Sequence, residues 1–398
     1  MENNIKAVRR EVKFCGNSPH TTTYGINNAE KVISYHRSFP EYMPTPLAKL
    51  NNLAEFLGVG SVHVKDESHR FGLNAFKVLG GSYCLGVYIA ERMSMDKNSL
   101  SYAKISDDSV KQKLGELTFV TATDGNHGRG IAWAANRIGH NSVVFMPKGS
   151  AKQRLESIQN LGSNASVTEL NYDNTVRYAK KIADQNGWVL VQDTSWEGYE
   201  TAPTWIMQGY TTMAYEIVEQ LGAEKPTHIF LQSGVGSMAG AIAGFFADLY
   251  KENMPRLIIV EPNEADCMYQ TAKYDDGNLH SVKGSLNTIM AGLACGEPCG
   301  IGWDVLKEHA SCFISMPDYV AAKGMRVLGN PIGDDARIIS GESGASTLGL
   351  VVELMQKDDL EYLRKSLGLD KDSKILCIST EGDTDRQNYR RIVWDNQF

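Results

Sequence analysis

The sequence predicts an α/β fold built from two parallel-sheet domains, and two observations carry this prediction. Short β-rich runs alternate with helical stretches in two separate series along the 398 residues. Glycine-rich turns stand where the first strand of each series gives way to a helix. Such alternation is typical of a parallel sheet that is covered by helices on both faces. Two series therefore indicate two domains, and we expect a ligand to bind between them.

The first series runs from residue 117 to residue 192 without interruption. Its strands are expected at 117–121, 142–146, 166–170 and 188–192, and its helices at 130–138, 151–161 and 175–185. A glycine-rich turn, residues 124–128, joins the first strand to the first helix. Because every strand is followed by a helix, the strands are expected to lie parallel in one sheet.

The second series begins near residue 227. A strand is expected at 227–232, a helix at 237–249, a further strand at 256–260 and another near the chain end at 375–379. The apolar stretch 229–246 is interrupted by Gln232 and Ser233, which fits a buried strand and helix better than a membrane span.

Composition favours small-molecule chemistry. Hydrophobic residues make up 42% and charged residues 22%, which is ordinary for a globular protein. The net charge of −7 comes without long runs of one sign, so neither nucleic acid nor an anionic membrane is an expected partner. The N-terminal segment lacks the apolar core of a signal peptide, so we expect a cytoplasmic protein.

Cysteines and histidines give no sign of a metal centre. The seven cysteines are an odd number without paired CxxC spacing and are expected to be reduced thiols, with Cys295 and Cys299 as the one close pair. The nine histidines show no metal-ligand spacing. We therefore expect no catalytic metal.

The loop Gly234, Val235, Gly236, Ser237, Met238 is the first candidate site. It leaves a strand and opens a helix, where backbone N–H groups and the helix dipole can hold a phosphate. The same loop also fits GxGxx(G/A), and Glu261 ends the next strand, where a dinucleotide-binding enzyme would hold a ribose. A third interpretation is that the glycines only permit tight packing. The loop by itself predicts a phosphate site without naming the ligand.

Lys77 is the second candidate. Most lysines are solvated, but Phe76 and Val78 flank this one and Gly80 and Gly81 follow. Such surroundings could desolvate the amine, lower its pKa and favour a Schiff base with a carbonyl compound.

The turn from Thr121 to Gly128 is the third candidate. Its backbone amides can hold a carboxylate, and Asn126 can donate to a phenolate oxygen. The alternative is an Asx-type turn that caps a helix. His127 could contact a ligand or serve as a structural histidine.

Taken together, these segments resemble a known family. The Lys77 segment, the turn, the glycine loop and Ser379-Thr380 follow the order seen in pyridoxal-phosphate enzymes of the tryptophan synthase β-subunit group, and the sequence is most similar to the diaminopropionate ammonia-lyases. The stretches that carry this resemblance span nearly the whole chain and are RFGLNAFK (70–77), TDGNHGRG (123–130), QDTSWEGY (192–199), PTWIMQGY (203–210), IMAGLACGEP (289–298), RIISGESGA (337–345) and STEGDTD (379–385).

The resemblance implies a role for each candidate residue. Lys77 would bind the cofactor pyridoxal 5'-phosphate covalently, Asn126 would face its ring oxygen, and Ser379 or Thr380 would meet its pyridine nitrogen. A hydroxyl partner leaves that nitrogen less firmly protonated, which suits elimination. The residues implied to hold the phosphate are Gly234, Val235, Gly236, Ser237 and Met238.

Asp124 departs from the broader group, because serine and threonine dehydratases usually place a serine at this turn. A carboxylate here would pair with the β-ammonium of 2,3-diaminopropionate and could exchange protons with it. Asp193 is the second carboxylate candidate, with a capping role as its alternative. The implied reaction eliminates ammonia from either stereoisomer: Lys77 works on one face of the substrate, and Asp124, helped by Asp193, works on the other.

The family also implies an architecture. A small domain, residues 94–194, would be inserted into a large cofactor-binding domain made of residues 1–93 and 195–398, as in fold type II enzymes, and the protein would be a homodimer. Three rival functions stay open at this point. They are a serine or threonine dehydratase, a nicotinamide-dependent dehydrogenase that uses Glu261, and a metabolite-binding protein without turnover.

Overall fold

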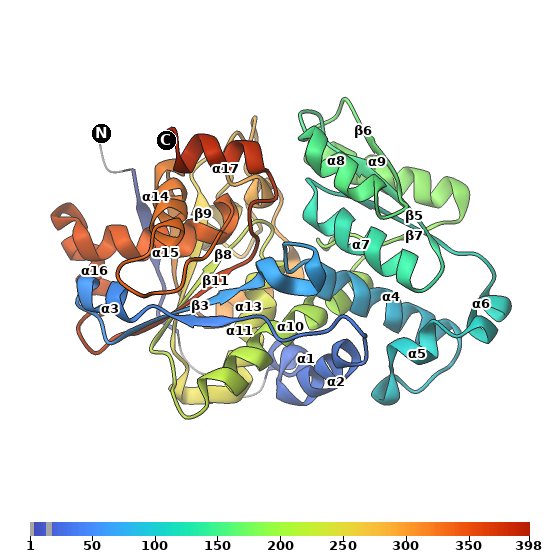
Figure 1. The fold of residues 1–398 in the computed structure, drawn as a ribbon, viewed down its shortest axis with the longest axis horizontal. Coiled ribbons are helices and arrows are strands. Elements are labelled where there is room, and N and C mark those ends of the chain that lie inside the picture. Colours follow the sequence, from blue (N-terminus) through green and yellow to red (C-terminus); the bar gives the residue numbers. More distant parts are fainter. Residues whose placement is uncertain (1–3, 13–17) are drawn as a thin grey trace.

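The computed structural model describes residues 4–12 and 18–398, which form two β-sheets (Figure 1). One sheet has seven strands and the other has four. Helix α4 (Val78–Arg92) runs between them and packs against α10 (Thr201–Leu221) on the side of the large sheet and α7 (Asn126–Arg137) on the side of the small sheet. The predicted α/β fold class is confirmed.

The seven-stranded sheet has a parallel centre and antiparallel edges. The strands from β10 to β3 run parallel, whereas the short edge strands β1 and β2 pair antiparallel with β10 and β3. Short edge strands limit pairing with other chains. In order across the sheet the strands are β1 (Lys6–Arg9), β10 (Ala310–Met316), β9 (Arg256–Pro262), β8 (His228–Gln232), β11 (Lys374–Ser379), β3 (Ser61–Asp66) and β2 (Leu47–Lys49).

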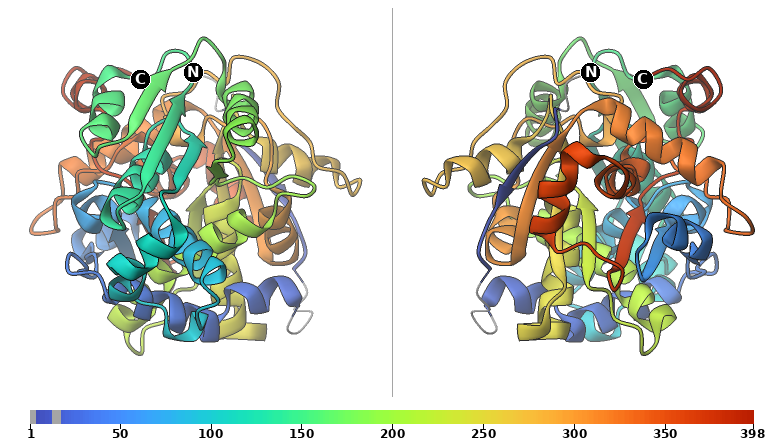
Figure 2. Two further views of the ribbon diagram at one scale, coloured as in Figure 1. Left: turned by 90° about the vertical axis from the view of Figure 1, so that its right-hand side faces the viewer. Right: turned by 90° about the vertical axis from the view of Figure 1, so that its left-hand side faces the viewer.

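Helices cover both faces of this sheet. Ile229 and Leu231 point to one hydrophobic cluster and Phe230 to the other, as the alternation of a strand requires. The first cluster packs under α4, α10, α1 (Pro19–Tyr24), α2 (Ile26–Arg37), α11 (Ser237–Tyr250), α12 (Cys267–Tyr274) and α13 (Gly300–His309). The second packs under α3 (Asn51–Leu57), α14 (Asp318–Gly329), α15 (Glu342–Gln356), α16 (Glu361–Leu367) and α17 (Arg386–Val393), several of which face the viewer in orange and red in the right-hand view of Figure 2.

The four-stranded sheet is wholly parallel and also carries helices on both faces. One cluster joins Val120 and Val143 to Ala179 of α9 (Tyr172–Asn186), and another joins Val144 to α7 and to Ile158 of α8 (Lys152–Gln159). Across the sheet the strands are β6 (Asn164–Val167), β5 (Asn141–Met146), β4 (Thr118–Ala122) and β7 (Val189–Leu190). All seven elements predicted for residues 117–192 are present.

Two element boundaries differ from the prediction for local reasons. Strand β6 ends at Val167 because the Thr168 hydroxyl accepts from the backbone N–H of Leu170 and turns the chain. Helix α7 begins four residues earlier than expected, at Asn126. It can begin there because the preceding residue is Gly125, whose φ of 153° is a conformation that glycine adopts readily.

Each sheet has a topological switch point, where the strand order reverses. In the large sheet, β8 leads outward through β9 to β10, while β11 and β3 lie on its other side. In the small sheet, β4 leads through β5 to β6, while β7 lies on its other side. Ligands of parallel α/β sheets bind at the carboxyl ends of the strands at such points. The turns after β8, β11, β4 and β7 are therefore positioned to build a site.

The predicted inserted domain contains the whole small sheet, which spans residues 118–190, together with α5 (Tyr102–Ile105) and α6 (Asp108–Leu114). Its boundaries at residues 94 and 194 stay a prediction. No helix within residues 4–12 and 18–398 has the length and hydropathy needed to cross a membrane. Residues 1–3 and 13–17, part of the segment in which no signal peptide is expected, lie outside the described residues, and so does Cys15.

Candidate active site

A pocket lies where the carboxyl ends of the two sheets meet. The Lys77 segment, the turn at 123–127, the glycine loop and the residues after β11 all contribute to its walls. Ten of the eleven predicted site residues line it, and Ser379 is the exception. The fold thus brings together segments that lie far apart in the sequence.

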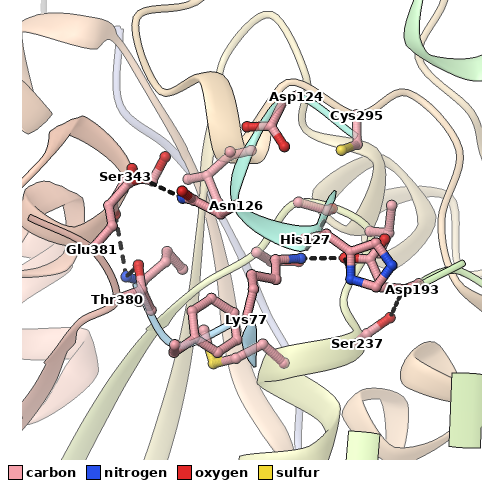
Figure 3. A pocket seen from close by; sticks show the side chains of 18 of the residues that line it. Lys77, Asp124, Asn126, His127, Asp193, Ser237, Cys295, Ser343, Thr380 and Glu381 are labelled. Atoms are coloured by element: carbon pink, nitrogen blue, oxygen red, sulfur yellow. Dashed lines mark hydrogen bonds and ion pairs between the residues drawn. The ribbon is translucent and has the colours of Figure 1, made fainter. Parts of the chain in front are cut away.

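Lys77 lies at the start of α4 and extends its amine into the pocket, where it forms an ion pair with Asp193 (Figure 3). The aromatic rings of Phe76 and Tyr210 flank the amine, with centroids 5.5 and 6.0 Å from Nζ. Burial disfavours the charged amine and would lower its pKa. The attraction of the Asp193 carboxylate is stronger than this effect and holds the pKa of Lys77 above its ordinary value. The expectation of a lowered pKa, drawn from the apolar neighbours alone, is wrong for this amine because it missed the ion pair.

Asp193 follows β7 and is nearly fully buried. Burial alone would raise the pKa of this carboxyl, but His127 and Lys77 lower it below the ordinary range. Its backbone carbonyl also accepts a hydrogen bond of 2.7 Å from the hydroxyl of Ser237. Asp193 therefore joins the amine to the glycine loop and is ionised in this state.

The glycine loop connects β8 to α11, and its N–H groups begin the helix. Gly236 has a φ of +97°, a backbone conformation that favours glycine over residues with a side chain. The first N–H groups of a helix lack partners within the helix and attract anions. The loop is thus shaped to hold an anionic group against the pocket.

The turn before α7 presents Asp124 to the pocket. The Thr123 hydroxyl accepts from the backbone N–H of Gly125 at 2.9 Å and fixes the turn, while about a quarter of the Asp124 side chain (26%) stays exposed. Asp124 lies beside Cys295 in Figure 3. Burial raises the pKa of Asp124, and Arg154 and Lys77 oppose that rise.

Asn126 donates a hydrogen bond of 2.6 Å to Glu381, a residue that the sequence reasoning missed as a site residue (Figure 3). Glu381 follows β11, is 2% exposed, and its Oε1 has no hydrogen-bond partner. The motif STEGDTD contained it, but its contact with Asn126 spans 255 residues of sequence. No local pattern signals such a contact.

The two hydroxyls after β11 have different surroundings. The Thr380 side chain lines the pocket, and its Oγ1 accepts a hydrogen bond of 2.9 Å from Nε2 of Gln232. Ser379 is fully buried and donates instead to Ser340 at 2.7 Å. Of the two candidates, Thr380 is therefore the one within reach of a ligand.

His127 has one ring nitrogen committed to the protein. Its Nε2 lies 2.9 Å from the carbonyl of Val191, which needs a donor, so Nε2 carries the hydrogen. Its Nδ1 lies 3.8 Å from Asp193, and burial lowers the pKa of the ring. The structure supports the structural role, in a residue that also borders the pocket.

The further side chains that line the pocket and were not singled out as site residues include Tyr172, Gln232, Cys295 and Ser343. Glu261, the candidate for a ribose contact, does not line it. Its buried carboxylate accepts from the backbone N–H groups of Met268 and Tyr269 at 2.9 and 2.7 Å and caps α12. Glu261 is therefore not placed to bind a ribose, as the dehydrogenase interpretation requires.

The remaining titratable groups show no metal centre. Within the described ranges, no group of three or more His, Cys, Asp or Glu side chains could hold a metal ion. Six cysteines in the described part of the chain are free thiols, including Cys295 and Cys299.

The pocket fits pyridoxal phosphate, the cofactor that the resemblance implies. It offers a buried amine, an anion cradle at a helix start and a hydroxyl from Thr380. Four buried polar atoms on its walls also lack hydrogen-bond partners: Nδ1 of His127, Oε1 of Gln232, Oγ of Ser343 and Oε1 of Glu381. Buried polar atoms need partners, and a polar ligand would supply them.

Comparisons with known proteins point the same way. The model of the family "Pyridoxal-phosphate dependent enzyme" matches residues 39–378. A diaminopropionate ammonia-lyase of Salmonella typhimurium is 51% identical over 375 residues, which cover 93% of each chain. The crystal structure of the holo diaminopropionate ammonia lyase of Escherichia coli superimposes with a TM-score of 0.93 at 46% identity and covers 100% of this chain and 98% of the other. The same enzyme in complex with an aminoacrylate–pyridoxal-phosphate azomethine reaction intermediate gives a TM-score of 0.91 at 46% identity, with coverage of 100% and 98%.

Proposed function

We propose that this chain, which belongs to the pyridoxal-phosphate-dependent enzymes and within them to the diaminopropionate ammonia-lyase family, converts 2,3-diaminopropionate to pyruvate and two molecules of ammonia. The reaction is a carbon–nitrogen lyase reaction with an amino acid as substrate. The observation that carries the proposal is the meeting of Lys77, Asp124 and Asp193 in one pocket. One cationic amine and two carboxylates provide the acid–base groups that an elimination from a diamino acid needs.

The Lys77 amine would hold pyridoxal phosphate, and the bound cofactor would supply the electron sink that makes the α-proton of an amino acid acidic. We assign its phosphate to the backbone of residues 234–238 and its ring oxygen to Asn126. Thr380, rather than Ser379, is the proposed partner of the pyridine nitrogen because only Thr380 of the two lines the pocket. A hydroxyl partner favours elimination over reactions that need a long-lived carbanion.

Lys77 and Asp124 divide the proton transfers in this proposal. The Lys77 amine, in its neutral form, takes the α-proton from one face of the substrate, and Asp124, supported by Asp193, takes it from the opposite face. This division accounts for the use of both the D and the L isomer. The Cα–H and Cβ–N bonds break, ammonia leaves with the Cβ–N electron pair, and the released aminoacrylate reacts with water to give pyruvate and the second ammonia.

Asp124 also defines the preferred substrate. The β-ammonium of 2,3-diaminopropionate is a cation where serine has a neutral hydroxyl, and a carboxylate at this position pairs with that extra charge. A serine or threonine dehydratase is the second candidate, since it would use the same cofactor pocket. The carboxylate of Asp124 favours the diamino acid.

A ratio of products separates the two functions. Pyruvate and ammonia are measured after addition of D- or L-2,3-diaminopropionate, or of D- or L-serine, to the holoprotein. We expect two ammonia per pyruvate and the higher kcat/KM with the diamino acid. A higher kcat/KM with serine, at one ammonia per pyruvate, would favour the dehydratase instead.

We further propose, from the family resemblance, that the protein is a cytoplasmic homodimer. Sedimentation of the holoprotein tests the oligomeric state, with a mass of twice the 43.9 kDa chain expected.

A further inference from the structure

Arg154 is a buried cation beside the candidate base Asp124. It lies on α8, which covers the small sheet, and only 11% of its side chain is exposed. Its Nη1 stands 3.8 Å from Oδ2 of Asp124. The stem of Arg154 packs over Gly125, where an added Cβ would stand 3.0 Å from the arginine Cδ. Arg154 also lines a groove that shares Asp124 and Tyr172 with the pocket.

Four carboxyl groups act electrostatically on Arg154. Besides Asp124, they are Glu381 after β11, Glu342 at the start of α15 and Asp385 before α17. Burial disfavours the guanidinium charge, but these carboxylates raise the pKa of Arg154 above its ordinary value. The guanidinium therefore stays charged at every pH at which the protein works.

The charged groups around Asp124 show why its ionisation depends on Arg154. Lys77 and Arg154 are the nearby cations, while Glu381 and Asp193 are the nearby anions. Lys77 is already paired with Asp193. Among the described residues, Arg154 is the cation within ion-pair distance of Asp124.

The remaining titratable neighbours of Asp124 add no charge. Burial raises the pKa of both Tyr172 and Cys295, and the carboxylates next to them raise it further. Both groups are therefore neutral near pH 7. Arg154 is left to oppose burial and the two anions.

We propose that Arg154 is a positioning residue for the elimination, and that it holds the Asp124 carboxylate ionised and directed into the pocket. A carboxylate must be ionised to accept the α-proton or to pair with a β-ammonium. Without the guanidinium, burial and the neighbouring anions would favour the protonated form. This inference rests on the proposed function, because it assigns Arg154 to the reaction through Asp124.

The test compares pH profiles of kcat/KM for the D and L isomers in the wild-type holoprotein and four variants. Arg154→Met removes the charge, Arg154→Lys keeps it, and Asp124→Asn identifies the isomer that depends on the carboxylate. Lys152→Met is the matched control, because Lys152 lies on the same helix but is 87% exposed and pairs with Glu156.

For the isomer that depends on Asp124, we expect Arg154→Met to lower kcat/KM roughly tenfold on the acidic side of the profile, the size typical of losing an opposite charge nearby. The loss should shrink as the pH rises, because the carboxylate then ionises without help. The other isomer should change little, Arg154→Lys should restore the profile, and Lys152→Met should match the wild type.

An equal loss for both isomers at every pH, or an unmoved profile, would overturn the role of Arg154. A small and equal effect of Asp124→Asn on both isomers would overturn the role of Asp124 and, with it, that of Arg154. If the wild-type holoprotein releases no pyruvate from either isomer, the proposed function itself is wrong. The three failures are therefore distinguishable.

Discussion

The Lys77 amine and the Asp193 carboxylate form a largely buried ion pair across 116 residues of sequence. Lys77 belongs to the segment that follows β3 of the large sheet, and Asp193 follows β7 of the small sheet. The ion pair therefore spans the two sheets at their carboxyl ends. It keeps the amine protonated and the carboxylate ionised in this state of the protein.

Removing Asp193 should speed the uptake of pyridoxal phosphate by the apoprotein near pH 7. An amine must be neutral to attack a carbonyl, and Asp193 raises the pKa of Lys77. In Asp193→Asn that support is lost, the pKa of Lys77 falls, and more of the amine is neutral at a given pH. Stopped-flow absorbance after addition of pyridoxal phosphate measures the rate.

The gain should shrink once the pH passes the lower pKa of Lys77 in Asp193→Asn, because the amine of the variant is then already neutral while the neutral fraction of the wild-type amine still rises. Asp173→Asn provides a control, since Asp173 borders the neighbouring groove and has no ion pair with Lys77. Equal uptake rates in Asp193→Asn and the wild type would show that the ion pair does not hold the charge of the amine.

Asp124→Asn should affect the two isomers of 2,3-diaminopropionate unequally. The amide cannot accept the α-proton, and loss of a general base costs roughly 10²–10⁴-fold in rate. We expect a loss of that size for one isomer and a much smaller loss for the isomer served by Lys77. Pyruvate release from each pure isomer measures both, and an equally small loss for the two would show that Asp124 is not a base.

Thr380→Val and Ser379→Ala should have different consequences. The Thr380 hydroxyl faces the pocket, so its removal should weaken cofactor binding and shift the visible absorbance of the holoprotein. The Ser379 hydroxyl bonds to Ser340 within the core, so its loss should lower stability by about 1 kcal/mol and leave the absorbance unchanged. The opposite result would place Ser379, not Thr380, next to the cofactor.

Arg70→Met should destabilise the protein by about 3–5 kcal/mol, because it leaves buried carboxylates without a partner. Arg70 is fully buried and binds Glu67 at 2.9 Å and Glu216 at 2.6 Å, while Lys65 binds Glu216 at 2.7 Å. Urea unfolding of the holoprotein measures the loss.

The matched control is Arg37→Met, which breaks the exposed pair with Glu219 and should cost about 0–1 kcal/mol. Similar losses in the two variants would mean that the buried cluster contributes no more to stability than a surface ion pair.

The small sheet could be predicted from the sequence because its strands and helices alternate and its strands are apolar. Strand β3 was missed for the opposite reason. It carries His63, Lys65 and Asp66, yet all three are buried, and Lys65 is neutralised by Glu216 from α10. Glu216, the partner that allows Lys65 to be buried, lies 151 residues away in the sequence. A local sequence pattern therefore cannot predict this contact.

The candidate site shows the same division. Lys77 and the glycine loop became candidates because each lies in a segment with a recognisable local pattern, and Asp124 was added because it departs from the serine that the resemblance leads one to expect at its turn. Glu381 and Arg154 were not, because their importance comes from contacts with Asn126 and Asp124 across the pocket. The charge state of Lys77 was misjudged because its apolar neighbours are local in sequence and Asp193 is not.

The most direct test of the account is one absorbance experiment on the purified holoprotein and on Lys77→Ala. D- or L-2,3-diaminopropionate is added while the visible spectrum and pyruvate are followed in the same cuvette. We expect the wild-type band, which reports the cofactor joined to Lys77, to shift as pyruvate appears, and we expect Lys77→Ala to show neither the band nor turnover. A wild-type band that stays unchanged without pyruvate, or full turnover by Lys77→Ala, would contradict this expectation.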